Sequence, residues 1–597
     1  MLFEGLDVAK DVRDHKILPN QYLVLRLNFA AVERSCDTMR AELSLSSMIN
    51  NSIMEFYRSY APYLGGETHM QLIKERIYKD SPAESLRQCV ESVEEALRIV
   101  IGENEGRHPL ARVKGIYLLI DEYDALSNSY TDPDTTKWNA SYPAGSLQGF
   151  YAAVKESIGH LMIEKIFITG VSPVALADLT SDFNVERDVS FRNTLSGLCG
   201  LTRDDVKAAL KILPEVDSVE KELSDLMNFV NGYHFCYYNK VEPVFNTTTC
   251  LEYLQNRLEN QPFALQLHNP PHSEVNEDIL SICASSPIAR NILEEALERN
   301  SNGAFRPLSY SKLTQKLKLT DLGEDNLSTW QSFLLYHGGL TFDSHNPTKQ
   351  MRIPNLIAAR RIAAAVSDRY GLVVKDIDRA IDIFAATGDI TESLKLYQDL
   401  MSKRDVHHGD FDKTEEFHAN SFNHSLLKNV LLTITPEFEV TQKGLSTGKV
   451  VPGRVDLVVL HPRHVTVIEW KSINIDFLAI ESTGDPGQGH ARLNKARALS
   501  RISDADELLE VKFSENDEWR KGKTINEWVH SGHDDSPQSQ IKQYLESPEI
   551  TQFLDMDNGR KFHAYLVVVI GNRKILLWDV DRGGQLESAR LVGDWYE

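Results

Sequence analysis

Residues 453–473, GRVDLVVLHPRHVTVIEWKSI, contain two runs of apolar residues on either side of a short polar segment. With a four-residue turn at 461–464, the two runs form a β-hairpin. Side chains alternate between the two faces of a strand, so this register places Asp456 opposite Glu469 and puts Lys471 on the same face. Both faces are otherwise largely apolar, which is typical of a strand inside a sheet. The hairpin is therefore expected in a protein core, with three charged residues in it.

Two carboxylates that face each other across neighbouring strands repel, and burial makes their ionisation costlier. A divalent cation would relieve both effects, because Mg²⁺ prefers hard oxygen ligands and takes one or two carboxylates with waters and phosphate oxygens. We therefore expect Mg²⁺ or Mn²⁺ at Asp456 and Glu469, with Lys471 orienting the attacking water or holding the scissile phosphate. This chemistry is suited to phosphodiester hydrolysis. The alternative is a surface hairpin in which Glu469 and Lys471 form a solvated ion pair.

An Asp followed after twelve residues by Glu-Trp-Lys resembles the active-site motif of the PD-(D/E)XK nuclease superfamily. The resemblance implies a restriction-endonuclease-like α/β domain in which Asp456, Glu469 and Lys471 are catalytic. Two positions depart from the pattern. Val455 precedes the aspartate where proline is common, and Asn420 lies in the preceding helical segment where an acid is expected.

The segment SQIKQYLE carries Gln540 and Tyr544 four residues apart, which places them on one face of a helix. In several branches of the superfamily such a helix helps to position the substrate and the active site. The resemblance therefore adds both residues to the predicted site. Glu416 is the acid nearest to Asn420 in the earlier segment, but it is out of register.

The first 200 residues alternate between apolar strand patterns and amphipathic helical patterns. Residues 22–30, 115–126 and 165–176 are predicted strands, and residues 83–102 and 146–162 are predicted helices. Strands separated by helices predict a parallel sheet that is covered on both faces.

The strand IYLLIDEYDAL ends in acids at Asp121 and Glu122, and Thr169 stands at the C-terminal end of the strand KIFITGVSP. The carboxyl ends of parallel strands form the ligand-binding edge of an open sheet. This is the form of a Walker B motif, in which the Asp binds Mg²⁺ and the Glu polarises the attacking water, with Thr169 in the sensor position. The alternative is a buried strand that happens to end in acids.

Seven blocks of the chain occur in the order typical of the AAA-ATPase-like domain family: LLIDEYDAL, FITGVSPVALADL, CGLTRDDV, FVNGYHF, VFNTTTCLEYL, LLYHGGLTF and MRIPN. The chain resembles that family, which is often fused to a PD-(D/E)XK nuclease domain, over nearly its whole length. The resemblance implies a P-loop NTPase-like sheet that binds ATP with Mg²⁺ at Asp121, Glu122 and Thr169.

The glycine-rich phosphate loop of that family would precede the block LFEGLDV, where this sequence starts at Met1. We therefore expect poor ATP binding and no ATPase activity from the chain as given, through truncation or through loss of the loop. Gly522-Lys523-Thr524 carries the last letters of such a loop, but Asp517 stands where its first glycine belongs.

A chain of 597 residues is too long for one hydrophobic core, and three domains are predicted. An AAA-ATPase-like α/β domain without the phosphate loop occupies 1–200. A helical region at 201–395 starts its first helix with Thr202 as the N-cap, and a short strand among its helices favours a winged-helix arrangement. The nuclease-like domain occupies 396–597 with a polar insert at about 480–537, in which the basic segment ARLNKARALSR contacts nucleic acid or forms a solvated helix face.

The net charge of −22, from 64 basic and 86 acidic residues, excludes a basic surface that would bind nucleic acid as a whole. Binding of DNA or RNA would need a local patch, metal ions or a partner chain. The six cysteines are scattered without a CxxC pair, and no run approaches the ~18 apolar residues of a membrane span. These features predict an intracellular protein with neither a disulfide framework nor a membrane segment.

The sequence thus predicts a Mg²⁺-dependent nuclease, acting on DNA or RNA, joined to a degenerate or truncated AAA-ATPase-like module. One alternative is an NTP-regulated switch that binds protein partners and carries a catalytically inactive nuclease fold. Another is a scaffold.

Overall fold

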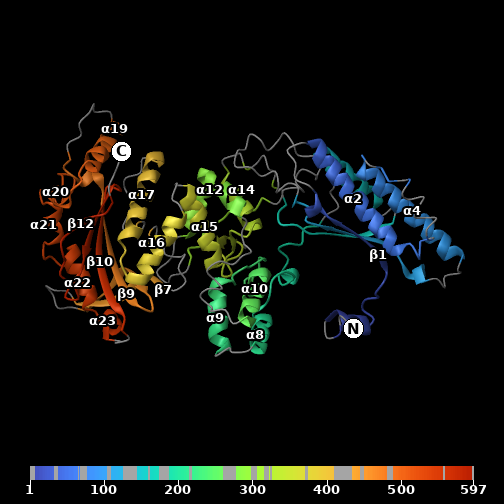
Figure 1. Cartoon of the computed structure of the whole chain (residues 1–597), viewed down its shortest axis with the longest axis horizontal. Coiled ribbons are helices and arrows are strands. Elements are labelled where there is room, and N and C mark those ends of the chain that lie inside the picture. The colour runs from blue at the N-terminus through green and yellow to red at the C-terminus, as the bar shows by residue number, and fades with distance from the viewer. Residues whose placement is uncertain are drawn as a thin grey trace. The chain divides into compact units, whose positions relative to one another are not determined.

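The computed structural model divides the chain into two compact units, residues 1–189 with 311–337, and residues 190–310 with 338–597. Each unit is described by itself (Figure 1). The structure describes residues 4, 7–32, 38–64, 66, 75, 77–78, 80–103, 109–125, 144–158, 162–173, 187–213, 218–259, 277–297, 305–314, 317, 322, 326–369, 374–408, 418, 422, 433–443, 450–480, 488–555 and 559–593.

The first unit contains a three-stranded parallel sheet in the order β1-β2-β3. The strands are β1 (Tyr22–Asn28), β2 (Gly115–Asp121) and β3 (Ile163–Ile168). Because β2 is central, its C-terminal residue Asp121 lies beside Asn28 on one side, and Ile120 lies beside Ile168 on the other. The parallel sheet predicted near the N-terminus is confirmed.

The long helices of this unit follow the predicted order between the strands. They are α2 (Thr38–Tyr60), α4 (Pro82–Glu103) and α6 (Ala144–Ser157), and α4 contacts both α2 and α6. Along β1 the side chains of Leu23, Leu25 and Leu27 are buried, whereas Arg26 between them is exposed. Among the described residues the helices thus bury one face of the sheet, and the expected cover on both faces is not seen. The remaining elements are α1 (Asp7–Arg13), η1 (Phe29–Ala31), η2 (Pro109–Arg112) and α14 (Leu327–Tyr336).

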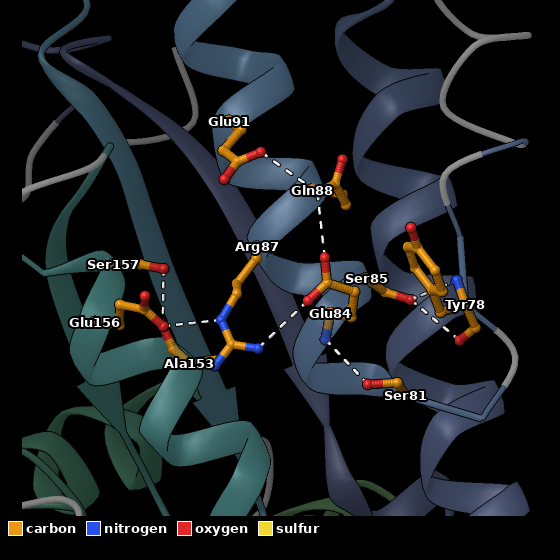
Figure 2. Close-up of polar contacts among 10 residues, drawn as sticks. All are labelled: Tyr78, Ser81, Glu84, Ser85, Arg87, Gln88, Glu91, Ala153, Glu156 and Ser157. Carbon is orange, nitrogen blue, oxygen red and sulfur yellow. Dashed lines mark hydrogen bonds and ion pairs between the residues drawn. The ribbon is translucent and has the colours of Figure 1, made fainter.

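Helices α4 and α6 are also joined by polar contacts on their solvent side (Figure 2). Arg87 of α4 donates from Nε to Glu156 Oε2 of α6 at 2.8 Å, and its Nη1 lies 3.4 Å from Glu84 Oε2 one turn away. Near the start of α4, Ser85 Oγ accepts from the Tyr78 backbone N–H at 3.0 Å. Because Glu156 is solvent-exposed and Arg87 is only half-buried, the apolar core beneath them contributes most of the stability here.

The first part of the second unit is mostly helical. Its elements are η4 (Asn193–Leu195), α8 (Arg203–Ile212), α9 (Val219–Phe229), α10 (Thr247–Leu258), α12 (Glu277–Ser285), α13 (Pro287–Leu297) and α15 (Leu356–Arg369). Thr202 caps α8 in a capping box with Asp205, which confirms the predicted helix start. A small antiparallel sheet has the order β4-β6-β5, from β4 (Leu308–Ser309), β6 (Gln350–Arg352) and β5 (Thr341–Phe342). The winged-helix arrangement stays a prediction.

The second unit ends in a six-stranded mixed sheet of order β12-β11-β10-β9-β8-β7. Only β9 and β10 run parallel; the other pairs are antiparallel. The strands are β7 (Thr433–Lys443), β8 (Val450–Leu460), β9 (His464–Ile473), β10 (Lys561–Ile570), β11 (Lys574–Asp579) and β12 (Arg590–Leu591). The predicted β8–β9 hairpin is confirmed, since Leu460 pairs with Val465 and His461 N–H donates to the His464 carbonyl at 2.9 Å.

Helices cover both faces of this sheet (Figure 1). One face packs against α16 (Val374–Thr387) and α17 (Thr391–His408), so part of the chain before residue 396 belongs to this core. The other face packs against the segment after β9: η6 (Ile475–Phe477), α19 (Gln488–Ser500), α20 (Ala505–Leu509), α21 (Ile525–Val529), α22 (Pro537–Leu545) and α23 (Pro548–Asp555). The stretch predicted as a polar insert therefore supplies core residues, including Leu499, Leu508 and Phe513.

Candidate functional site

The hairpin β8–β9 brings Asp456, Glu469 and Lys471 to the middle of the C-terminal sheet. The two strands pair from Leu460 with Val465 to Leu457 with Ile468, and the ladder stops there, one residue before Asp456. On the other side of β9, Glu469 lies beside Leu566 and Lys471 beside Val568 of β10. Leu566 and Val568 belong to the face covered by α22, and neighbours across strands share a face. Glu469 and Lys471 are therefore buried on the α22 side.

The charges at this site are compensated within the protein. Lys471 Nζ donates to Glu469 Oε1 at 2.7 Å and to the Trp470 carbonyl at 2.9 Å. Glu469 is 1% exposed and Lys471 9%, so water screens this pair little. The sequence argument held that a cation must lie between two opposed carboxylates. In the structure the charge of the Glu469 carboxylate is instead neutralised by Lys471, two residues along the same strand.

Asp456 lies just beyond the last backbone pair of the β8–β9 ladder, and its carboxylate takes up a backbone donor. Asp456 Oδ2 accepts the Trp470 N–H at 2.7 Å, in a charge-assisted hydrogen bond. The pair predicted from ideal alternation is therefore not two bare carboxylates facing each other, because each carboxylate has a hydrogen-bond donor of its own.

The donor set fits a hard divalent cation in its chemistry. Asp456 and Glu469 supply carboxylate oxygens, which are the hard ligands that such a cation prefers. Among the described residues, no group of three or more His, Cys, Asp or Glu is placed to hold a metal ion. Mg²⁺ nevertheless binds with one or two carboxylates when waters and phosphate oxygens complete its shell. Asn420 and Glu416, where a further acid was sought, lie outside the described residues.

Gln540 and Tyr544 lie on α22, as the sequence predicted, and this helix contacts β7, β8 and β10. The start of α22 is set by Ser536, whose hydroxyl accepts the Ser539 N–H, and by Pro537 in the first turn. Tyr544 packs in the apolar core of this face, and Gln540 Oε1 is buried with no hydrogen-bond partner in the described part of the chain. The helix thus brings both residues to the face of the sheet that buries Glu469 and Lys471.

A second candidate site lies at the carboxyl edge of the N-terminal parallel sheet. Thr169 Oγ1, just after β3, donates to Asp121 Oδ1 at the end of β2 over 2.5 Å. The Glu122 N–H donates to the same Oδ1 at 3.1 Å, and Glu122 has a positive φ of 53°. Burial raises the pKa of the Glu122 carboxyl, and the charges of Asp124 and Asp121 add to this effect. The structure therefore brings together the three residues that the sequence singled out here.

Asp124 was missed by the sequence argument, although it belongs to the same run of acids. Its fully buried carboxylate accepts the Ser172 N–H at 2.6 Å and the Val171 N–H at 3.1 Å, and the neighbouring Tyr123 hydroxyl donates to the Ser172 carbonyl. These bonds hold the loop after Thr169 against the end of β2. The sequence could have indicated Asp124 by its position three residues after the end of a buried strand. Which backbone N–H groups donate to its carboxylate is visible only in the folded structure.

Comparison with known proteins finds a match for the region that contains the second candidate site. Residues 1–180 match the family model described as Predicted AAA-ATPase. Asp121, Glu122 and Thr169 all lie within the matched AAA-ATPase-like region, which confirms the resemblance for this part of the chain. No curated protein and no solved structure matches the chain, and the comparisons give no support for a fused nuclease domain. Among the described helices, none combines the length and the hydrophobicity that crossing a membrane requires.

Proposed function

We propose that the C-terminal part of the chain hydrolyses phosphodiester bonds of nucleic acid with Mg²⁺ or Mn²⁺ bound at Asp456 and Glu469. The observation that carries this proposal is the buried Lys471 ammonium, which bonds Glu469 Oε1 beside an aspartate on the neighbouring strand. Burying an ammonium and a carboxylate together costs several kcal/mol of desolvation, so such pairs are poor devices for stability alone. A half-buried Asp beside a buried Glu and Lys on the adjacent strand is chemistry that phosphodiester cleavage uses.

Each side chain has a defined role in this proposal. Asp456, held by the Trp470 N–H, and Glu469, held by Lys471, supply the oxygen ligands. The cation, when bound, would act as a Lewis acid and acidify a coordinated water. Lys471, whose ammonium donates to Glu469 Oε1 and to the Trp470 carbonyl, holds the attacking water or a phosphate oxygen in this proposal. Gln540 and Tyr544 of α22 position the substrate on this face.

The basic segment at 491–501 contributes little to nucleic-acid binding in this proposal. Arg492 forms an ion pair with Asp476, and Lys495 Nζ donates to the Leu478 carbonyl at 2.9 Å. Both side chains thereby attach α19 to the segment that follows β9, which leaves Arg497 and Arg501 as the exposed cations. With a net charge of −22, the chain would contact a phosphate backbone mainly through the bound cation.

Cleavage assays test this function directly. The full chain is expected to cut single-stranded or duplex DNA or RNA in Mg²⁺ or Mn²⁺ and not in EDTA, and Asp456→Ala is expected to abolish cutting. Asp504→Ala is the matched control, because Asp504 is exposed and its side chain makes no capping bond to α20. Cleavage that survives Asp456→Ala would show that another site is responsible.

The second candidate is an NTP-regulated switch that binds protein partners and carries an inactive nuclease fold. The specific support is the Asp121–Thr169 bond at the carboxyl edge of the sheet, within the region that matches the predicted AAA-ATPase family. Calorimetric titration with Mg²⁺–ATP of this chain, and of a chain extended upstream, tests it. Binding that is lost in Asp121→Ala, together with no cleavage of any nucleic acid, would favour the switch. Absence of binding to both chains would contradict it.

A further inference from the structure

Trp470 connects two of the three proposed site residues through its own peptide groups. Its N–H donates to Asp456 Oδ2 at 2.7 Å, and its carbonyl accepts from Lys471 Nζ at 2.9 Å. Asp456 is on β8, and Lys471 reaches from the next position of β9 to Glu469. The orientation of this single residue in β9 therefore governs hydrogen bonds on both sides of the site.

The indole of Trp470 lies on the opposite face of the sheet, among aromatic rings. Its centroid is 5.7 Å from that of Tyr397 with an edge-on interplanar angle of 80°, and 5.3 Å from that of Phe422. Trp470 and Phe422 are fully buried, and Tyr397 is 4% exposed. Such ring pairs favour particular separations and angles, so they restrain the indole more than aliphatic contacts of equal area would.

This aromatic cage is anchored to helix α17. Tyr397 is a residue of α17, and its hydroxyl lies 2.8 Å from Nδ1 of the fully buried His418. The indole Nε1–H of Trp470 is buried with no hydrogen-bond partner among the described residues. An unmatched buried donor costs about 1–3 kcal/mol, and phenylalanine would avoid that cost. Among the described residues, the indole thus contributes to this core through ring packing and not through a hydrogen bond.

We propose that Trp470 is the positioning residue of the metal site and that α17, through Tyr397, regulates the site by fixing the Trp470 indole. This inference rests on the proposed function. Successive side chains of a strand leave one continuous backbone toward opposite faces. If loss of the indole packing displaces the Trp470 Cα, the peptide groups on both sides of it turn, and hydrogen bonds weaken steeply as their angles close. Asp456 and Lys471 then lose their orientation although neither has been changed.

The test compares the same substitution at two buried tryptophans of one sheet. Trp470→Phe keeps an aromatic ring in the cage and removes the unmatched donor, so the variant is expected to fold. Trp578→Phe on β11 is the matched control: Trp578 is 1% exposed, and β10 separates its strand from β9. Tyr397→Phe tests the α17 connection, since it keeps the ring that packs against the indole but removes the hydroxyl contact with His418 that fixes the orientation of that ring.

Two measurements on the full chain are needed. Calorimetric titration with Mn²⁺ alone is expected to show an affinity about tenfold to a hundredfold weaker in Trp470→Phe, about threefold or more weaker in Tyr397→Phe, and unchanged in Trp578→Phe. Hydrogen exchange of the metal-free chain, followed by mass spectrometry on the β9 peptide, is expected to be faster in Trp470→Phe than in wild type and Trp578→Phe. The second measurement requires no metal and no activity.

The outcomes separate the two proposals. If wild type binds Mn²⁺ and Asp456→Ala does not, the metal site stands. Equal Mn²⁺ affinity in wild type and Trp470→Phe would then overturn the positioning role alone, and equal affinity in Tyr397→Phe would overturn the control by α17. If wild type binds no Mn²⁺ in a manner dependent on Asp456, both the proposed function and this inference fall.

Discussion

Replacing Lys471 by methionine tests whether the Glu469–Lys471 pair is buried and charged as the structure shows. At the observed 2.7 Å separation and an effective dielectric constant of about 20, the gross attraction is about 6 kcal/mol. Part of this is offset by desolvation of the two charges. Removing one partner of such a pair nevertheless costs about 3–5 kcal/mol, because an uncompensated charge stays inside. Lys471→Met is therefore expected to lower the free energy of unfolding by that amount at pH 8.

The deficit should depend on pH in a defined direction. Without the ammonium, burial of Glu469 raises its pKa above the ~4.3 of an unfolded chain. The folded variant then binds this proton more tightly than the unfolded chain does, so the stability of the variant recovers as pH falls through the raised pKa. The double variant Glu469→Gln with Lys471→Met carries no buried charge, and it is expected to be more stable than Lys471→Met alone at pH 8.

Urea denaturation at pH 8 and pH 5.5, with hydrogen exchange of the β9 peptide as the local measure, provides the assay. Thr441→Val is a suitable reference on the same sheet, because Thr441 is exposed and bonds Glu549 at the surface. A loss of less than about 1 kcal/mol in Lys471→Met at both pH values would refute the reasoning, since that is the range of solvated surface pairs.

Three further predictions concern other parts of the chain. Burial lowers the pKa of His464 to about 4, so between pH 6.5 and 4 only the unfolded chain binds the additional proton. The free energy of unfolding therefore decreases by up to about 3 kcal/mol as the pH is lowered through this range. His464→Gln should reduce this acid dependence in denaturation curves. Gly232 has a φ of +108°, and an added Cβ would lie 1.9 Å from the Pro354 carbonyl oxygen. Gly232→Ala should therefore lower the free energy of unfolding by about 2–4 kcal/mol in chemical denaturation. Gly197 has open space around it, so Gly197→Ala should lower the free energy of unfolding by less than about 1 kcal/mol. Arg87→Ala should change the free energy of unfolding by less than about 1 kcal/mol in the same assay, because the ion pairs it removes lie at the surface, where water screens them.

The sequence by itself determined the local elements. Apolar runs at β1, β2 and β3 separated by amphipathic helices were enough to predict a parallel sheet, because crossover connections favour parallel neighbours. The period of two along β8 and β9 was enough to predict their register, since a slip by one residue would turn every apolar side chain to the wrong face. The meeting of Asp121 with Thr169 followed from the same logic, because parallel strands end at a common edge.

The tertiary structure alone decided how the charges of the hairpin are paired. Ideal alternation predicts two opposed carboxylates, but the backbone ladder stops at Leu457, and Asp456 takes the Trp470 amide. It also decided that α16 and α17 cover one face of the C-terminal sheet and that the polar segment after β9 supplies the core of the other. These outcomes depend on contacts between residues far apart in the chain. Periodicity shows which face of an element is apolar, but packing and hydrogen bonding in the folded state select the partner that covers it.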